Sequence, residues 1–252
     1  MRTPTRPPQR SGNPALREDV FTATRTAGGG VMTVQGTVNK TALLLVLALA
    51  TATATGAWVL GTAGGPGVAG WAIGAVLVGL GVAIATIVRP QWSPVTAPIY
   101  ALVEGVVLGV VSMWFEASYP GIAIQAVALT FGVMGAMLVL YRTGVIKVTQ
   151  RFRSSVIAAT LGIAVVYLVA LVLGLFGVRV PFLYDASPLG ILISLAIVVV
   201  AALNLLLDFD LIERGARSGA PAYMEWYAAF GLLVTLVWLY LELLRLLARL
   251  RR

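Results

Sequence analysis

The chain alternates between long apolar runs and short polar connections. Seven of the runs approach about 20 residues, the length with which an α-helix crosses the hydrocarbon core of a bilayer. They cover approximately residues 41–61, 68–88, 95–115, 121–141, 155–177, 188–208 and 226–247. The pattern therefore predicts an all-α integral membrane protein that folds as a seven-transmembrane-helix bundle, with no room for a separate soluble domain.

The composition agrees with a membrane protein. Of the 252 residues, 59% are hydrophobic and only 11% are charged, whereas a soluble domain carries about 25% charged residues. The N-terminal segment is the exception, because it combines Pro, Arg, Ser and Gly with few apolar side chains. Such a segment cannot bury enough surface to offset the entropy of ordering it. We therefore expect residues 1–35 to be a disordered cytoplasmic tail and residues 36–252 to be the transmembrane domain.

The basic residues favour one orientation in the membrane. If the spans alternate, most lysines and arginines fall on the side of the N-terminus, namely Arg2, Arg6, Arg10, Arg17, Arg25, Lys40, Arg89, Arg142, Lys147, Arg151, Arg153, Arg214 and Arg217. The opposite connections hold Arg179, and a full seventh crossing also places the basic C-terminal tail there. By the positive-inside rule, this asymmetry predicts a cytoplasmic N-terminus. We expect a multi-pass protein of the plasma membrane. The asymmetry also argues that the net charge of +8 does not serve nucleic-acid binding.

Two aspartates lie where the sixth apolar run meets its polar end. Asp208 and Asp210 are the first charged residues in the run that starts at Pro188. A charged side chain at the centre of a membrane helix costs about 2.5–3.5 kcal/mol on insertion scales, and less near the interface, so this pair suggests an ion or proton path. Asn204 precedes Asp208 by four residues and shares its helix face. For Asp210, an ion pair with Arg214 four residues later is the simpler interpretation.

Two glutamates are candidates to share a proton or a cation with Asp208. Glu104 lies near the middle of the third run, and this depth makes it the carboxylate expected to be most buried. Glu225 begins the last run, where it suits the helix dipole and is expected at the depth of Asp208. Two carboxylates a few ångströms apart in a low dielectric cannot both ionise cheaply, so we expect Asp208 to couple to one of them. Glu242 is instead predicted to pair locally with Arg245.

Small residues in the third run predict close helix packing. Gly105 and Gly109 are four residues apart in GVVLG and therefore lie on one helix face. Glycines at this spacing let two membrane helices approach closely, so a packing role is expected for them.

Five segments carry a pattern known from a protein family. They read GTVNKTALLL at 36–45, PVTAPIYALVEGVVLG at 94–109, GIAIQAVALTFGVM at 121–134, LNLLLDFDLIE at 203–213 and MEWYAAFGLLVTLVWLYLELLRLL at 224–247. Together they resemble the Bax inhibitor-1 family, and more closely its actinobacterial branch. The resemblance implies a seven-helix bundle with the last helix central and, as in bacterial members, a pH-sensitive calcium leak. It also implies an aspartate late in the sixth span that faces a second one in the last span. Asp208 in DFDLI fits the first position, whereas Thr235 stands at the second.

Two classes of function follow from these features. The first is an ion leak for calcium or protons, in which Asp208, Asp210, Glu104, Asn204 and Thr235 could supply oxygen ligands to calcium. The second is a membrane regulator that transports nothing and binds other membrane proteins, such as quality-control proteases. No resident cofactor is expected. The chain has no histidine or cysteine, which removes histidine-bearing triads, thiol nucleophiles and zinc sites with those ligands, so an enzyme is not expected.

Overall fold

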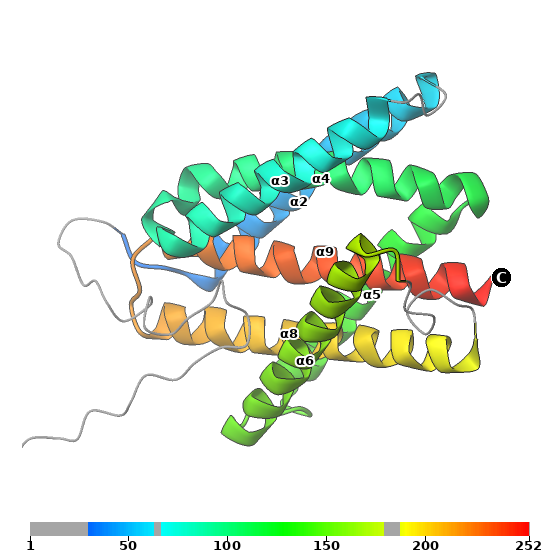
Figure 1. Cartoon of the computed structure of the whole chain (residues 1–252). Helices are drawn as coiled ribbons and strands as arrows, with labels where there is room; N and C mark the ends of the chain where they lie inside the picture. Colours follow the sequence, from blue (N-terminus) through cyan, green and yellow to red (C-terminus); the bar gives the residue numbers. More distant parts are fainter. Residues whose placement is uncertain (1–29, 63–66, 179–186, 252) are drawn as a thin grey trace, which may run out of the picture.

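Seven long helices form the fold. The structure is a computed structural model, and it describes residues 30–62, 67–178 and 187–251 (Figure 1). The long helices in this part of the chain are α2 (Val34–Gly61), α3 (Gly67–Val88), α4 (Ser93–Ser118), α5 (Ile122–Arg142), α6 (Gln150–Leu175), α8 (Pro188–Arg217) and α9 (Met224–Leu250). All seven are long and apolar enough to cross a membrane. The predicted all-α bundle is therefore confirmed.

Helix α9 lies at the centre of the bundle, with α2, α3 and α4 on one side and α8 on the other (Figure 1). It contacts α2, α4, α5 and α8. In its most apolar stretch 72% of the residues are buried, against 11% in α3 and in α6. Its Phe230 is fully buried and meets the ring of Tyr100 on α4 edge-on, with the ring centroids 5.0 Å apart. The central position predicted for the last helix is confirmed.

Polar residues just outside the apolar runs start the helices. The hydroxyl of Thr33 accepts a hydrogen bond from the amide of Gly36 at the start of α2, at 2.9 Å. Ser187 accepts one from the amide of Gly190 at the start of α8, at 3.1 Å. Each contact satisfies an amide that the first turn of a helix leaves without a backbone partner. With its cap at Thr33, α2 begins at Val34 instead of near residue 41, whereas α8 begins at Pro188, where the predicted apolar run starts.

The chain before α2 pairs with the turn between α8 and α9. Val31 and Pro221 form an isolated antiparallel bridge. The amide of Met32 donates to the carbonyl of Ala220 at 2.7 Å, and Met32 is buried. The predicted tail lies outside the described residues as far as residue 29. Of residues 30 to 35, Val31 forms the bridge and Val34 begins α2. The division into a tail and a transmembrane domain stays a prediction.

Helix α8 continues past the end of the sixth apolar run. It ends at Arg217, so Asp208 and Asp210 lie inside a helix and only residues 218–223 connect it to α9. Ion pairs between residues four apart support the extension, with Arg214 at 2.7 Å from Asp210 and Arg217 at 2.6 Å from Glu213. We call the end of the bundle that holds this connection the turn end, and the other the C-terminal end.

Helices α2 and α4 approach each other closely at two glycines. A Cβ atom built on Gly105 would overlap the side chain of Thr51 and the carbonyl oxygen of Ala48. A Cβ atom on Gly109 would lie 2.6 Å from the carbonyl oxygen of Ala52. The close packing predicted from the spacing of the two glycines is confirmed, with α2 as the partner.

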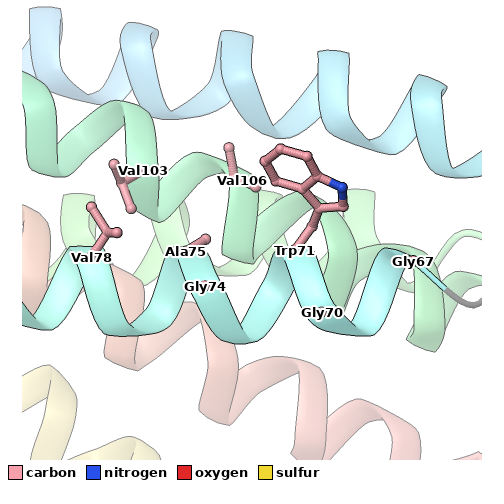
Figure 2. A pocket seen from close by; sticks show the side chains of 8 residues that line it. All are labelled: Gly67, Gly70, Trp71, Gly74, Ala75, Val78, Val103 and Val106. Carbon is pink, nitrogen blue, oxygen red and sulfur yellow. The ribbon is translucent and has the colours of Figure 1, made fainter.

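An apolar groove of about 570 Å³ lies between α3 and α4, which line it together (Figure 2). Its lining consists of Gly67, Gly70, Trp71, Gly74, Ala75 and Val78 from α3 and Val103 and Val106 from α4. The indole of Trp71 lies along the groove, and this residue is 69% exposed. The groove therefore opens to the outside of the bundle, and its lining suits the hydrocarbon chains of lipids.

Candidate functional site

Asp208 is buried inside the bundle. It is 1% exposed, and Asn204, one helical turn before it, is 3% exposed. The amide nitrogen of Asn204 donates to the hydroxyl of Thr160 on α6 at 2.8 Å and to the carbonyl of Val200 at 2.9 Å. A carboxylate this far from water is costly, so its position in a membrane protein makes Asp208 a candidate for function. The face that Asn204 and Asp208 share is thus the inward face of α8.

Thr235 lies on α9 at about the level of Asp208. With a rise of 1.5 Å per residue, Asp208 is about 14 Å from the end of α8 and Thr235 about 17 Å from the start of α9. The two helices run in opposite directions from one short connection and contact each other. Thr235 is buried, and its hydroxyl donates to the carbonyl of Gly231 at 3.3 Å. The depth of Thr235 agrees with the position that the sequence resemblance gives it.

Glu225 uses its carboxylate to hold α2. One oxygen accepts hydrogen bonds from the amide and the hydroxyl of Thr33, both at 2.8 Å. The other forms an ion pair with Lys40. Glu225 lies in the first turn of α9, as predicted, but the helical rise places it about 12 Å nearer the turn end than Asp208. The expectation of equal depth is wrong because α8 extends beyond its apolar run. The coupling of Glu225 to Asp208 stays a prediction, and the contacts described for this carboxylate are with α2.

Replacing Glu225 with glutamine is expected to destabilise the junction of α2 and α9. The variant loses the charge that Lys40 and Thr33 contact, and hydrogen bonds to charged groups contribute about 1.5–3 kcal/mol each. We therefore expect the free energy of unfolding in a denaturing detergent titration to fall by about 2 kcal/mol. As a control, Arg217→Gln removes one partner of an exposed ion pair and should change it by less than about 1 kcal/mol. Equal stability of the two variants would contradict this role of Glu225.

Glu104 lies at the edge of the bundle, on the side of α4 that faces α3. It lies one helical turn after Tyr100 on α4. A Cβ atom built on Gly79 of α3 would be 3.7 Å from its carboxylate. Glu104 is only half-buried, whereas Asp208, Glu225 and Glu242 are buried. The prediction that Glu104 is the most buried carboxylate is therefore wrong, because its position along the helix is central but its helix face is peripheral.

Asp210 belongs to a charged cluster near the turn end. It pairs with Arg214 at 2.7 Å, so the predicted pair is confirmed. It also pairs with Arg153 at 2.8 Å, an arginine of α6 that is 4% exposed. This contact from another helix was not predicted from the sequence.

Glu242 forms a second charged cluster, toward the C-terminal end. The Glu242 cluster consists of Tyr167 on α6 and Trp238, Glu242 and Arg245 on α9. The hydroxyl of Tyr167 donates to the carboxylate of Glu242 at 2.6 Å, and the indole nitrogen of Trp238 donates to the same oxygen at 3.2 Å. Arg245 lies 3.1 Å from Glu242, which confirms the predicted pair. Sequence reasoning missed that Glu242 is 1% exposed and that it binds α6.

A sequence signal for these missed residues exists. Arg153, Thr160 and Tyr167 follow each other at intervals of seven residues on α6. Thr235, Glu242 and Arg249 do so on α9. Seven residues are close to two helical turns, so each set lies along one helix face. Polar residues at this spacing in an apolar run indicate the face that turns inward.

The predicted calcium ligands do not assemble into one site. Among the described residues, no group of three or more acidic side chains is arranged to hold a metal ion. Asp210 is engaged by arginines, and Glu104 faces α3. Asp208, Asn204 and Thr235 remain together as buried polar residues near one level of α8 and α9. These three side chains alone offer fewer oxygen atoms than the six to eight ligands that a calcium ion takes.

Comparison with known proteins identifies the family. Searches of curated proteins and of solved structures gave no match. The family model described as Bax inhibitor 1 like matches residues 13–252, which include all seven long helices. Assignment to the actinobacterial branch stays a prediction. The buried acidic residues described above thus occur in a multi-pass membrane protein that belongs to the Bax inhibitor 1 like family.

Proposed function

We propose that this protein is a cation leak of the plasma membrane, with calcium or protons as the ion, and that Asp208 accepts the ion. The observation that carries the proposal is the burial of the Asp208 carboxylate, 1% exposed, among seven helices that are long and apolar enough to cross a membrane. Asn204 and Thr235 supply further polar atoms near the same level. Ionisable residues inside membrane bundles mark ion or proton pathways, which supports this assignment.

The charge distribution supports an orientation for the leak. Exposed basic residues on the described connections gather at the turn end, including Arg142, Lys147 and Arg151. By the positive-inside rule this end faces the cytoplasm, together with the N-terminus. Asp208 then lies in the cytoplasmic half of the bundle, about 14 Å from the end of α8. An ion from the cytoplasm would pass Asp210 and its partners Arg153 and Arg214 before it reaches Asp208.

Flux through vesicles tests the proposal. The purified full-length protein is reconstituted into liposomes that contain a calcium-sensitive or a pH-sensitive dye, and the rates are compared with protein-free liposomes at acidic and alkaline pH. Faster entry of calcium or of protons than in protein-free liposomes is the expected result, and the two dyes identify the ion. Equal rates with and without protein for both ions would overturn the proposal and favour the regulator that binds other membrane proteins.

A further inference from the structure

Polar side chains form a series of contacts between pairs of the helices α6, α8 and α9, which we call the polar seam. Four contacts define it, each of them between two different helices. From the turn end these are Arg153 with Asp210 at 2.8 Å, Thr160 with Asn204 at 2.8 Å, Tyr167 with Glu242 at 2.6 Å, and Ser194 with Arg249 at 2.6 Å. The seam therefore extends from the turn end toward the C-terminal end, where α6 at the periphery meets α8 and α9.

The spacing of these residues places the members of the seam on each helix along one face of that helix. On α6 the series runs from Arg153 to Tyr167, which is 14 residues or about 21 Å of helix. On α9 Thr235, Glu242 and Arg249 cover the same length. Together with Asp208 and Asn204 on the inward face of α8, they place polar atoms at successive levels over most of the thickness of a hydrocarbon core, about 30 Å.

Side chains bridge the seam where α6 meets α9. Helix α6 packs chiefly on α8, whereas α9 is packed by α2, α4, α5 and α8. The contact between α6 and the Glu242 side of α9 is made by long polar side chains, with Tyr167 reaching both Glu242 and Arg245. An interface held by such side chains can open by their rotation, without separating packed backbones.

We propose that the polar seam is the route of the ion and that Arg245 closes it one step before the Ser194–Arg249 contact, by occupying Glu242 in place of a passing cation. This inference rests on the proposed leak. Glu242 is a buried carboxylate, and the guanidinium of Arg245 lies against it at 3.1 Å. Arg245 also donates to the Tyr167 hydroxyl at 2.6 Å, and Tyr167 in turn donates to Glu242. The three side chains thus form a closed ring across the seam.

The geometry of Arg245 suits a closure that can be reversed. Its side chain is 36% exposed, whereas that of Glu242 is 1% exposed, so the arginine reaches from the surface to a buried acid. When the arginine side chain rotates toward the surface, a passing cation can bind Glu242 in its place. Such a cation is positively charged, as the guanidinium is. A cation that moves along the seam from Asp208 therefore competes with Arg245 for Glu242, the acidic position that follows Asp208 on the route.

Removal of the arginine tests the closure by two independent measurements. The chain has no cysteine, so Thr235→Cys introduces a single thiol inside the seam. We expect Arg245→Gln to raise its rate of reaction with a membrane-impermeant thiol reagent, added from the side of the C-terminal end, by about tenfold, a change of about 1.4 kcal/mol. Without the added cysteine, Arg245→Gln is expected to raise ion flux by a similar factor.

Two further variants test whether an effect of Arg245→Gln comes from opening the seam, from the lost positive charge or from misfolding. Arg251→Gln is the control, since this arginine lies at the same end of α9 but binds the carbonyl of Pro120 and Gln125 on the surface, at 2.9 and 2.7 Å. It should leave both rates unchanged. Tyr167→Phe keeps the ring and removes only the hydroxyl, and it should raise both rates by a smaller factor than Arg245→Gln. It serves as the second test if Arg245→Gln does not fold.

The outcomes distinguish this inference from the proposed leak. Faster thiol reaction without flux in any variant would support the closure and overturn the leak. Flux that depends on Asp208, with neither rate changed by Arg245→Gln or Tyr167→Phe, would overturn the closure and leave the leak standing. Equal increases in Arg245→Gln and Arg251→Gln would also overturn the closure, because they would reflect lost positive charge at that end.

Discussion

Asp208→Asn is expected to slow the flux of the transported ion by at least about tenfold, which corresponds to about 1.4 kcal/mol in the barrier. A cation that enters a low-dielectric bundle loses hydration, and a buried carboxylate offsets part of that cost by Coulomb attraction. Asparagine has nearly the same shape and no charge. The substitution therefore removes the attraction at a position that is 1% exposed while it keeps the packing of α8.

Initial rates of dye-reported flux in liposomes measure this effect, at equal protein content for each variant. Glu213→Gln is the matched control, because it removes a carboxylate from the same helix at a position where Glu213 pairs with the largely exposed Arg217. It should leave the rate within about twofold of the wild type, a change of less than about 0.5 kcal/mol. A wild-type rate in Asp208→Asn would exclude Asp208 as the accepting group, and equal losses in both variants would point to a general effect of charge.

Gly105→Ala is expected to lower the free energy of unfolding by about 1–3 kcal/mol, the usual cost of adding atoms to a packed interior. The added methyl group would overlap the side chain of Thr51 and the backbone carbonyl oxygen of Ala48. The carbonyl belongs to a helix backbone and cannot rotate away, so α2 and α4 must move apart. Because α2 and α4 also contact α9, the movement loosens the centre of the bundle.

A denaturing detergent titration followed by circular dichroism measures the loss. Gly132→Ala is the matched control, since no atom lies within 4 Å of a Cβ built on Gly132 in α5. Alanine favours a helix over glycine by up to about 1 kcal/mol, so this variant should be as stable as the wild type or slightly more stable. If Gly105→Ala proved as stable as Gly132→Ala, the close approach of α2 and α4 would be refuted.

The sequence predicts the number and approximate position of the helices because membrane spans need a fixed length of apolar residues. It predicts less well which face of each helix points inward. Both the lipid-facing and the buried faces of these helices are apolar, so hydrophobic periodicity does not separate them. Glu104 shows the consequence, because its depth in the run was clear but its orientation toward α3 was not.

The partners of the site residues were the hardest part to predict. Local pairs such as Asp210 with Arg214 and Glu242 with Arg245 follow from spacing along one helix. The contacts from Lys40 to Glu225 and from Arg153 to Asp210 join residues far apart in the sequence. They depend on which helices become neighbours, and one sequence holds little information on that arrangement.

The central position of α9 has a consequence for biosynthesis. This helix is synthesised after α2, α4, α5 and α8, yet all four pack against it. Until it inserts, the surfaces of α2 and α4 that it will cover, and the glutamate-binding residues Thr33 and Lys40 at the start of α2, face lipid or water. Assembly of the bundle is therefore completed only after α9 inserts, and a chain truncated before residue 224 would lack the element that contacts α2, α4, α5 and α8.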